Sequence, residues 1–295
     1  MRTALLTVLA LVAFAANSIL CRLALRDASI DAASFSTIRI AGGAAALLLA
    51  TASMRQPARA SGSWTSAALL FLYAVPFSMA YGSLTAATGA LILFGCVQLT
   101  MITAVLWGGE RSRGLEWSGL ALALSGLVYL LLPGLSAPPP AGAALMAVAG
   151  IAWGGYSVRG RRSIAPLRDT AGNFARAVPF ALAVTVVMVM RVNLSVRGTV
   201  LALVSGILAS GFGYVAWYAA LRGLTGTRAA LVQLSVPVLA ACGGVVFLGE
   251  RLSTRLVGSA GLVLGGIALA LAARSTAETG TRTGSATPRN SLRPS

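Results

Sequence analysis

The chain has 295 residues, of which 57% are hydrophobic and only 10% are charged, and its mean hydropathy is +0.83. Soluble domains usually carry about 25% charged residues, so this composition excludes a water-facing globular fold and indicates a lipid bilayer as the main partner. The 23 basic residues behind the net charge of +16 are all arginine, and most of them lie in short gaps between apolar runs. The chain has no separate basic domain that could bind nucleic acid, so nucleic acid is not expected as a partner.

Ten apolar runs approach the length of about 20 helical residues that crosses a bilayer core. The predicted spans are 3–21, 32–52, 65–83, 87–107, 115–133, 141–158, 170–190, 198–220, 227–248 and 255–273. Pro76 interrupts the third span. A tight turn is predicted at 84–89, between the third and fourth spans. The first run resembles a signal peptide, but the nine further runs favour a retained helix. Residues 274–295 predict a disordered cytoplasmic tail.

The arginines predict the orientation of the chain in the membrane. If the N-terminus is cytoplasmic, fifteen arginines fall on the cytoplasmic side, six on the outer side and two within spans. An excess of basic residues marks the cytoplasmic loops, so both termini are expected inside the cell. The exclusive use of arginine suggests a GC-rich bacterial genome, and hence the bacterial inner (plasma) membrane.

An internal duplication organises the chain into two halves. Residues 109–111 (Gly-Glu-Arg) recur at 249–251, and at this shift of 140 residues 84–132 match 224–272 at 13 of 49 positions. Each half holds five spans, an odd number, so the second half crosses the membrane upside down relative to the first. Inverted repeats of this kind are typical of secondary transporters.

The two halves resemble the EamA family of the drug/metabolite transporter superfamily over residues 1–273. The resemblance rests on residues 15–22, 88–94 with Gln98, 217–221, 227–237 and 247–251. It implies an all-α membrane protein of ten helices in two inverted five-helix repeats, at 1–133 and 141–273. It also implies a central cavity lined mainly by spans one, three, four, six, eight and nine, and the export of small metabolites such as amino acids.

Polar and aromatic side chains within the spans are candidates for lining that cavity, because a polar group in the bilayer needs a cavity or a partner. Hydrogen bonding between helices is the alternative interpretation. The candidates are Asn17, Ser18, Gln98, Trp153, Tyr156, Tyr214, Trp217, Tyr218 and Gln233.

Other polar residues have a structural alternative. Arg39 and Arg176 occupy corresponding places in spans two and seven, where they either attract a substrate anion or snorkel to the interface. Glu110 and Glu250 are interpreted as structural, each near a helix N-terminus and able to pair with the arginine beside it. Pro237 predicts a kink in span nine.

Several chemistries have no support in the sequence. The seven acids fall in loops, at helix ends or in the tail, histidine and lysine are absent, and the three cysteines lack metal-ligand spacing. An enzyme, a metal site, a cofactor and an ATP-binding loop are therefore not expected. The expected function is a secondary, non-ATP transporter of a small molecule that works by alternating access. A multidrug or nucleoside/purine efflux carrier, a non-transporting scaffold and a homodimer remain open.

Overall fold

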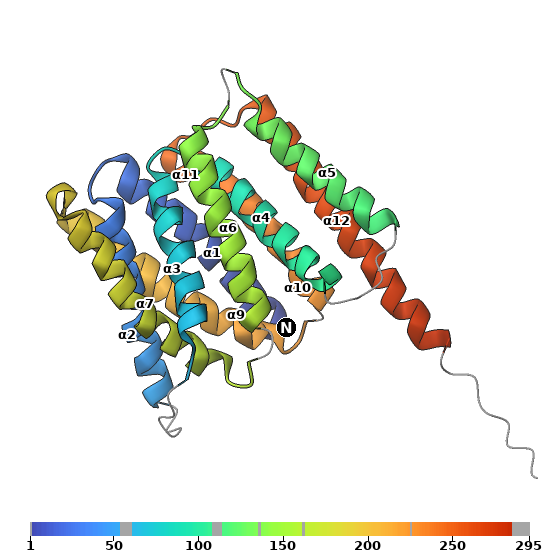
Figure 1. The fold of residues 1–295 in the computed structure, drawn as a ribbon, viewed down its shortest axis with the longest axis horizontal. Helices are drawn as coiled ribbons and strands as arrows, with labels where there is room; N and C mark the ends of the chain where they lie inside the picture. Colours follow the sequence, from blue (N-terminus) through green and yellow to red (C-terminus); the bar gives the residue numbers. More distant parts are fainter. Residues whose placement is uncertain are drawn as a thin grey trace, which may run out of the picture.

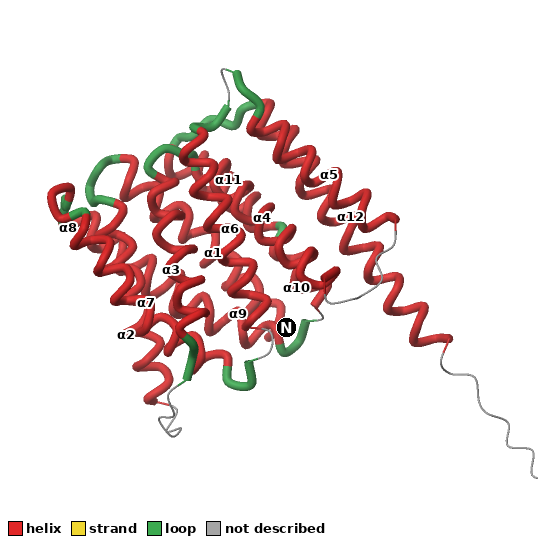
Figure 2. Tube along the Cα trace, viewed as in Figure 1, coloured by secondary structure: helices red, strands yellow, loops and turns green. Residues whose placement is uncertain are grey.

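The computed structural model describes residues 2–53, 61–107, 114–134, 137–160, 163–224 and 226–284. The described secondary structure is helical, apart from an isolated bridge between Ile30 and Leu194 (Figures 1 and 2). The elements are α1 (Arg2–Arg26), α2 (Ala32–Ser53), α3 (Trp64–Tyr81), α4 (Ala86–Trp107), α5 (Gly114–Leu131), α6 (Pro140–Gly160), α7 (Pro166–Val187), the 3₁₀-helix η1 (Val189–Arg191), α8 (Val196–Val204), the π-helix η2 (Ser205–Phe212), α9 (Gly213–Leu221), α10 (Gly226–Gln233), α11 (Ser235–Leu248) and α12 (Thr254–Gly284).

Nine described helical stretches are long and apolar enough to cross a membrane, and Trp117–Leu131 is a shorter apolar helix. The outer surface of the bundle fits a lipid environment: Leu49, Val187, Val246 and Phe247 are between 72% and 84% exposed. Apolar side chains on this scale would be unfavourable in water. The predicted all-α membrane protein of about ten helices is confirmed.

Two of the predicted spans are irregular helices. The eighth is one helical run in which the π-helix η2 separates α8 from α9, and the ninth is divided at Leu234 into α10 and α11. Pro237 lacks the N–H that an uninterrupted helix would donate to the carbonyl of Gln233, where α10 ends. The division of the ninth span therefore begins before the proline itself.

The end of the chain departs from the predicted pattern. Helix α12 continues past residue 273 to Gly284, through a segment expected to be disordered, and residues 285–295 lie outside the described part. The segment after residue 273 contains no proline before position 288, so nothing in it removes the backbone donors of a growing helix.

The two halves pack in a symmetric way. Helix α5 lies along α12 and α2 along α7, at opposite sides of the bundle in Figure 1. Helices α3 and α4 of the first half pack on α6, as α9 and α11 of the second half pack on α1. Arg22 near the end of α1 bonds the carbonyl of Tyr81, at the end of α3, whereas Arg159 near the end of α6 bonds Ser66, at the start of α3. Helices α1 and α6 therefore run in opposite directions, as inverted repeats require.

Glycines allow the close approach of α5 and α12. A Cβ added to Gly119 would lie 2.5 Å from the carbonyl oxygen of Gly266, and one added to Gly266 would lie 2.5 Å from the backbone nitrogen of Ala123. Helices in a bilayer associate through such small-residue contacts, because lipid gives them little hydrophobic drive to pack.

Candidate substrate pathway

A buried polar cluster lies between α1, α2, α3 and η2. Asn17 donates to the hydroxyl oxygen of Tyr73 (3.1 Å) and accepts from the hydroxyl of Ser205 (2.5 Å). Arg39 donates through Nη2 to the same Tyr73 oxygen (2.7 Å) and through Nε to Ser210 (3.4 Å). Three helices of the first half and one element of the second thus meet at buried hydrogen bonds.

The π-helix places its two serines in this cluster. The wider turn of a π-helix rotates the direction in which the side chains of the eighth span point. Such π segments are often found at functional sites. Gly206 brings η2 against α2, since a Cβ there would lie 2.3 Å from the carbonyl oxygen of Arg39. Close backbone contact at Gly206 therefore sets the distance between Arg39 and Ser210.

The cluster borders a small inner pocket of about 20 Å³. This volume is enough for about one water molecule. Polar and aromatic side chains make up most of its lining, which consists of Phe14, Asn17, Ser18, Arg39, Tyr73, Phe77, Leu93, Phe94, Trp153, Ala209, Ser210 and Tyr214.

Aromatic rings separate the inner pocket from a larger space. Trp153 of α6 lies 4.8 Å from Tyr73 and 5.2 Å from Tyr214, centroid to centroid, and it stacks on Tyr156 at 5.4 Å. Trp153 and Tyr214 line both the inner pocket and the larger space. These two side chains form a partition between them.

The larger space is a vestibule made of two adjoining cavities of about 520 and 410 Å³. Tyr156 and Tyr218 line both cavities, and the exposed Arg159 and Arg222 lie at their edges. The vestibule therefore reaches the surface where α6 ends and α7 begins. Asp169 lines it and accepts hydrogen bonds from Ser61 and Ser163.

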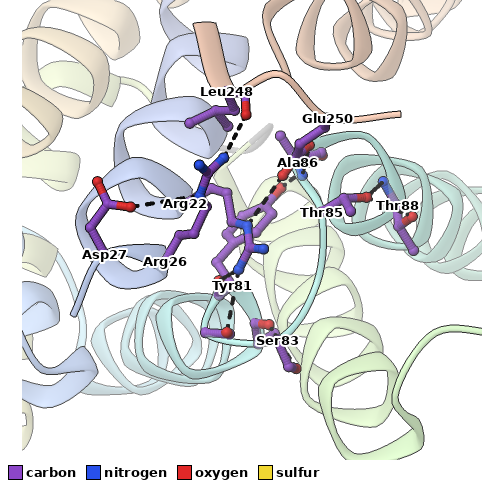
Figure 3. A network of polar contacts seen from close by, with 12 residues as sticks. Arg22, Arg26, Asp27, Tyr81, Ser83, Thr85, Ala86, Thr88, Leu248 and Glu250 are labelled. Atoms are coloured by element: carbon purple, nitrogen blue, oxygen red, sulfur yellow. Dashed lines mark hydrogen bonds and ion pairs between the residues drawn. The ribbon is translucent and has the colours of Figure 1, made fainter. Parts of the chain in front are cut away.

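The opposite end of the bundle is closed by a polar network, shown in Figure 3. Arg22 of α1 pairs with Glu250, with 3.2 Å between Nε and Oε1, and also donates to the carbonyl of Tyr81 (2.9 Å). The second carboxylate oxygen of Glu250 accepts from the backbone N–H of Ala86 (2.8 Å), the first residue of α4. One carboxylate thus connects the ends of α1 and α11 to the start of α4.

Further bonds strengthen this closed end. Arg26 donates to the carbonyl of Leu248 (2.5 Å), which adds a second link between α1 and α11 (Figure 3). Asp31, before α2, accepts from the backbone N–H groups of Ser34 (2.9 Å) and Asn193 (3.0 Å). Burial opposes ionisation of Asp31, but these hydrogen bonds outweigh it and hold its pKa below the usual value.

The structure distributes the candidate residues along one path. Asn17, Ser18 and Arg39 line the inner pocket, Trp153 and Tyr214 border both spaces, and Tyr156, Trp217, Tyr218 and Gln233 line the vestibule. Gln98 is buried in α4 and is not part of the lining of these cavities. Substrate contact by any of them remains a prediction.

The structure bears on two further residues: it favours one of the two interpretations of Arg176 and corrects the expected partner of Glu250. Arg176 donates to the carbonyls of Ser61 (2.6 Å) and Gly172 (3.0 Å), so it snorkels toward a helix end and is not directed into a pocket. Glu250 pairs with Arg22 of α1 and not with the adjacent Arg251. Its counterpart Glu110 lies outside the described residues.

Sequence reasoning missed Tyr73, Ser205 and Ser210, which share the cluster with Asn17 and Arg39. A tyrosine in the third span carried the same polar signal as Tyr214, so Tyr73 was open to prediction. The two serines offered no such signal, because small hydroxyl residues are common at helix contacts. Among the residues that the structure describes, no three His, Cys, Asp or Glu side chains gather as metal ligands.

A bundle of apolar helices that encloses a polar pocket, with a vestibule open at one end and an aromatic partition between the two, has the architecture expected of a multi-pass membrane transporter. A sequence model of the EamA-like transporter family matches residues 140–272. An uncharacterized protein of Pseudomonas aeruginosa is 53% identical, over 92% of this chain and 96% of its own. An uncharacterized transporter of Archaeoglobus fulgidus is 30% identical, over 66% of this chain and 72% of its own.

The uncharacterized inner membrane transporter YedA of Escherichia coli is 31% identical, over 49% of each chain. One solved crystal structure has the same fold, with a TM-score of 0.64 at 22% identity, and the match covers 90% of this chain and 97% of that one. The chain belongs to the EamA-like transporter family. It is a multi-pass protein of the bacterial inner membrane.

Proposed function

We propose that the protein is a secondary carrier that exports small metabolites, such as amino acids, by alternating access. The observation that supports this function best is the unequal state of the two ends of the path. The vestibule reaches the surface at one end, and the Arg22–Glu250 network closes the other, with the inner pocket between them. A carrier must expose one site to each side in turn, and this arrangement is one of its two states.

The vestibule faces the cytoplasm in this proposal, and both termini are cytoplasmic. The described arginines Arg159, Arg168 and Arg222 lie near the vestibule end, where α6 and α9 end and α7 begins. In the orientation that the arginine count predicts, this end is the cytoplasmic one, the side to which fifteen arginines are assigned from the sequence. The conformation is therefore inward-facing, which suits the uptake of a cytoplasmic metabolite for export.

Inverted repeats supply a physical route between the two states. We take residues 1–133 and 141–273 as the repeats. Because α3 and α4 pack on α6 as α9 and α11 pack on α1, the two halves can exchange conformations. The exchange would close the vestibule and open the Arg22–Glu250 end without a new fold.

Two alternatives keep the same fold. A nucleoside or drug carrier would use the same path, and the aromatic partition of Trp153 and Tyr214 offers faces on which a planar ring can stack. A non-transporting scaffold needs no internal path, and vestibule cavities of about 520 and 410 Å³ count against it. An enzyme needs a catalytic cluster, so the absence of histidine counts against that class.

Solute flux in liposomes tests the function. Purified full-length protein would be reconstituted, and uptake of labelled L-leucine, L-phenylalanine, 3-phenylpropionate, uridine and ethidium compared with protein-free vesicles. We expect flux of at least one solute, reduced by Asn17→Ala in the inner pocket but not by Leu49→Ala on the lipid-facing surface. Equal flux in protein-containing and empty vesicles for all five solutes would argue against a carrier.

A further inference from the structure

Arg39 is a buried charge without an acidic partner. Arg39 is only 3% exposed. It lies about 10 Å along α2 from the first residue of that helix. Among the described residues, no carboxylate lies within ion-pair distance of it. A lone cation at this depth is costly, and such side chains in membrane helices mark functional sites when they face a cavity.

The neighbours of Arg39 compensate its charge only in part. The guanidinium carbon lies 5.1 Å from the ring centroid of Tyr73 and 4.9 Å from that of Phe77, within the range of cation–π attraction. Nε and Nη2 donate to neutral hydroxyl groups, but Nη1 is buried and has no hydrogen-bond partner in the described part of the chain. A strong donor thus remains unused beside the inner pocket.

Tyr73 provides a second donor at the same place. Its hydroxyl oxygen accepts from both Asn17 and Arg39, and a phenol oxygen has two acceptor positions and one proton to donate. Both lone pairs are engaged, so the proton is available to another group. Tyr73 and Arg39 both line the inner pocket, which therefore presents two donors to an acceptor placed within it.

The pocket is unsuited to a cation. No acidic side chain is among the residues that line it, and the carbonyl oxygen of the Asn17 amide already accepts from Ser205. An ammonium group would meet the positive charge of Arg39 without an opposing carboxylate. A single negative charge would instead neutralise the site.

Arg176 shows that an arginine within a helix of this fold can have its Nη1 atom hydrogen-bonded. It occupies the place in α7 that corresponds to Arg39 in α2, yet its Nη1 donates to two backbone carbonyls near a helix end. Of the two arginines, only Arg39 lines the inner pocket.

We propose that the inner pocket binds the carboxylate of a monoanionic metabolite with an apolar body, and that Arg39 and Tyr73 hold that carboxylate. Carboxylates form strong, charge-assisted hydrogen bonds with guanidinium groups, and the rings of Phe14, Phe77 and Trp153 offer apolar contact to the remainder. The pocket must widen for such a ligand, which requires Trp153 and Tyr214 to part. This assignment rests on the proposed function, and it narrows the substrate class of the same path from small metabolites such as amino acids to monoanionic carboxylates.

Binding of matched carboxylate and amide probes tests this proposal. Full-length protein in lipid nanodiscs would be titrated with 3-phenylpropionate, 3-phenylpropanamide, phenethylamine and phenyl phosphate, and thermal stabilisation would be converted to apparent Kd. We expect 3-phenylpropionate to bind at least about tenfold more tightly than the amide, since one charge-assisted contact distinguishes them. Phenethylamine should bind no better than the amide.

Variants locate the effect. Arg39→Gln should remove the preference for the carboxylate, and Arg39→Lys should keep part of it. Arg176→Gln is the control and should keep the preference fully, because the native Arg176 side chain bonds backbone carbonyls outside the pocket. If Arg39→Gln does not fold, the comparison of carboxylate with amide in the wild-type protein still decides. Equal binding of both, no binding of the carboxylate, tighter binding of phenyl phosphate, or a preference that survives Arg39→Gln would each overturn the proposal.

Flux of the same probes separates this proposal from the carrier function. Transport of 3-phenylpropionate and its amide at equal rates would disprove the carboxylate site and leave the carrier intact. A carboxylate preference in binding without flux of any solute would disprove the carrier and leave the site intact.

Discussion

Replacing Glu250 with glutamine should open the closed end of the bundle. Glutamine keeps the shape of the side chain, and its carbonyl oxygen can still accept from the N–H of Ala86. The substitution therefore removes chiefly the charge that pairs with Arg22. The expected result is a shift of the population from the inward-facing to the outward-facing conformation.

The size of the shift follows from the burial of the pair. The side chains of Arg22 and Glu250 are 15% and 6% exposed, and removal of one partner from a buried pair costs about 3–5 kcal/mol. Arg22 keeps its bonds to the carbonyls of Tyr81 and Gly82, which reduces the cost to about 2 kcal/mol. That free energy corresponds to a shift of about 30-fold between the two conformations.

Electron–electron distance measurements give the populations. Spin labels at the exposed positions Ser83 and Leu252 flank the pair, on the loops after α3 and α11, in protein whose native cysteines have been replaced. Glu250→Gln should add a longer-distance population at this end.

Asp27→Asn is the matched control at the same end. Asp27 pairs with Arg197, but their side chains are 34% and 58% exposed, and such pairs contribute about 0.2–1 kcal/mol. The distance distribution should stay close to that of the wild type. An unchanged distribution in Glu250→Gln, or an equal change in Asp27→Asn, would refute the role of the Arg22–Glu250 pair in holding this end closed.

Three further substitutions test the path. Gly206→Ala places a Cβ 2.3 Å from a backbone oxygen of α2 and should lower stability by about 1–3 kcal/mol in thermal unfolding; Gly261→Ala, with nothing within 4 Å, is its control. Pro237→Ala restores a backbone donor for the carbonyl of Gln233 and should make the ninth span a more continuous helix. Solute flux should then fall, while the melting temperature stays the same or rises. Unchanged flux would count against a role in transport for the break between α10 and α11. Asn17→Leu leaves two buried hydroxyl groups short of a partner, at a cost of about 1–3 kcal/mol in the same assay, and an unaltered melting temperature would contradict that role.

The fold was open to prediction because lipid imposes it on the sequence. Helices are required wherever apolar runs cross a bilayer, and the Gly-Glu-Arg duplication at 109–111 and 249–251 marked the two halves. The role of Glu250 was not open to prediction in the same way. Its partner Arg22 lies 228 positions away in the chain, and no local pattern specifies contacts at that separation.

The candidate site shows the same limit. Asn17 and Tyr214 were identified because a polar or aromatic side chain within an apolar span is conspicuous. Arg39 and Arg176 have equivalent places in the two halves and could not be told apart, because their directions depend on tertiary neighbours. Gly206 brings η2 close to Arg39, whereas the carbonyl of Ser61 accepts from Arg176. Sequence periodicity also gave no sign of the π-helix that places Ser205 and Ser210 beside the pocket.

Alternating exposure of the path can be measured by labelling one position from each side of the membrane. Ser157→Cys lies in the vestibule and Ser18→Cys in the inner pocket, and each would be exposed to a charged thiol reagent in inside-out and right-side-out vesicles. In protein whose three native cysteines have been replaced and which is otherwise unchanged, Ser157→Cys should react only from the cytoplasmic side. Addition of Glu250→Gln should slow that reaction and make Ser18→Cys reactive from the outside. Reaction of Ser157→Cys from the outer side, or no effect of Glu250→Gln at either position, would contradict alternating access through this path.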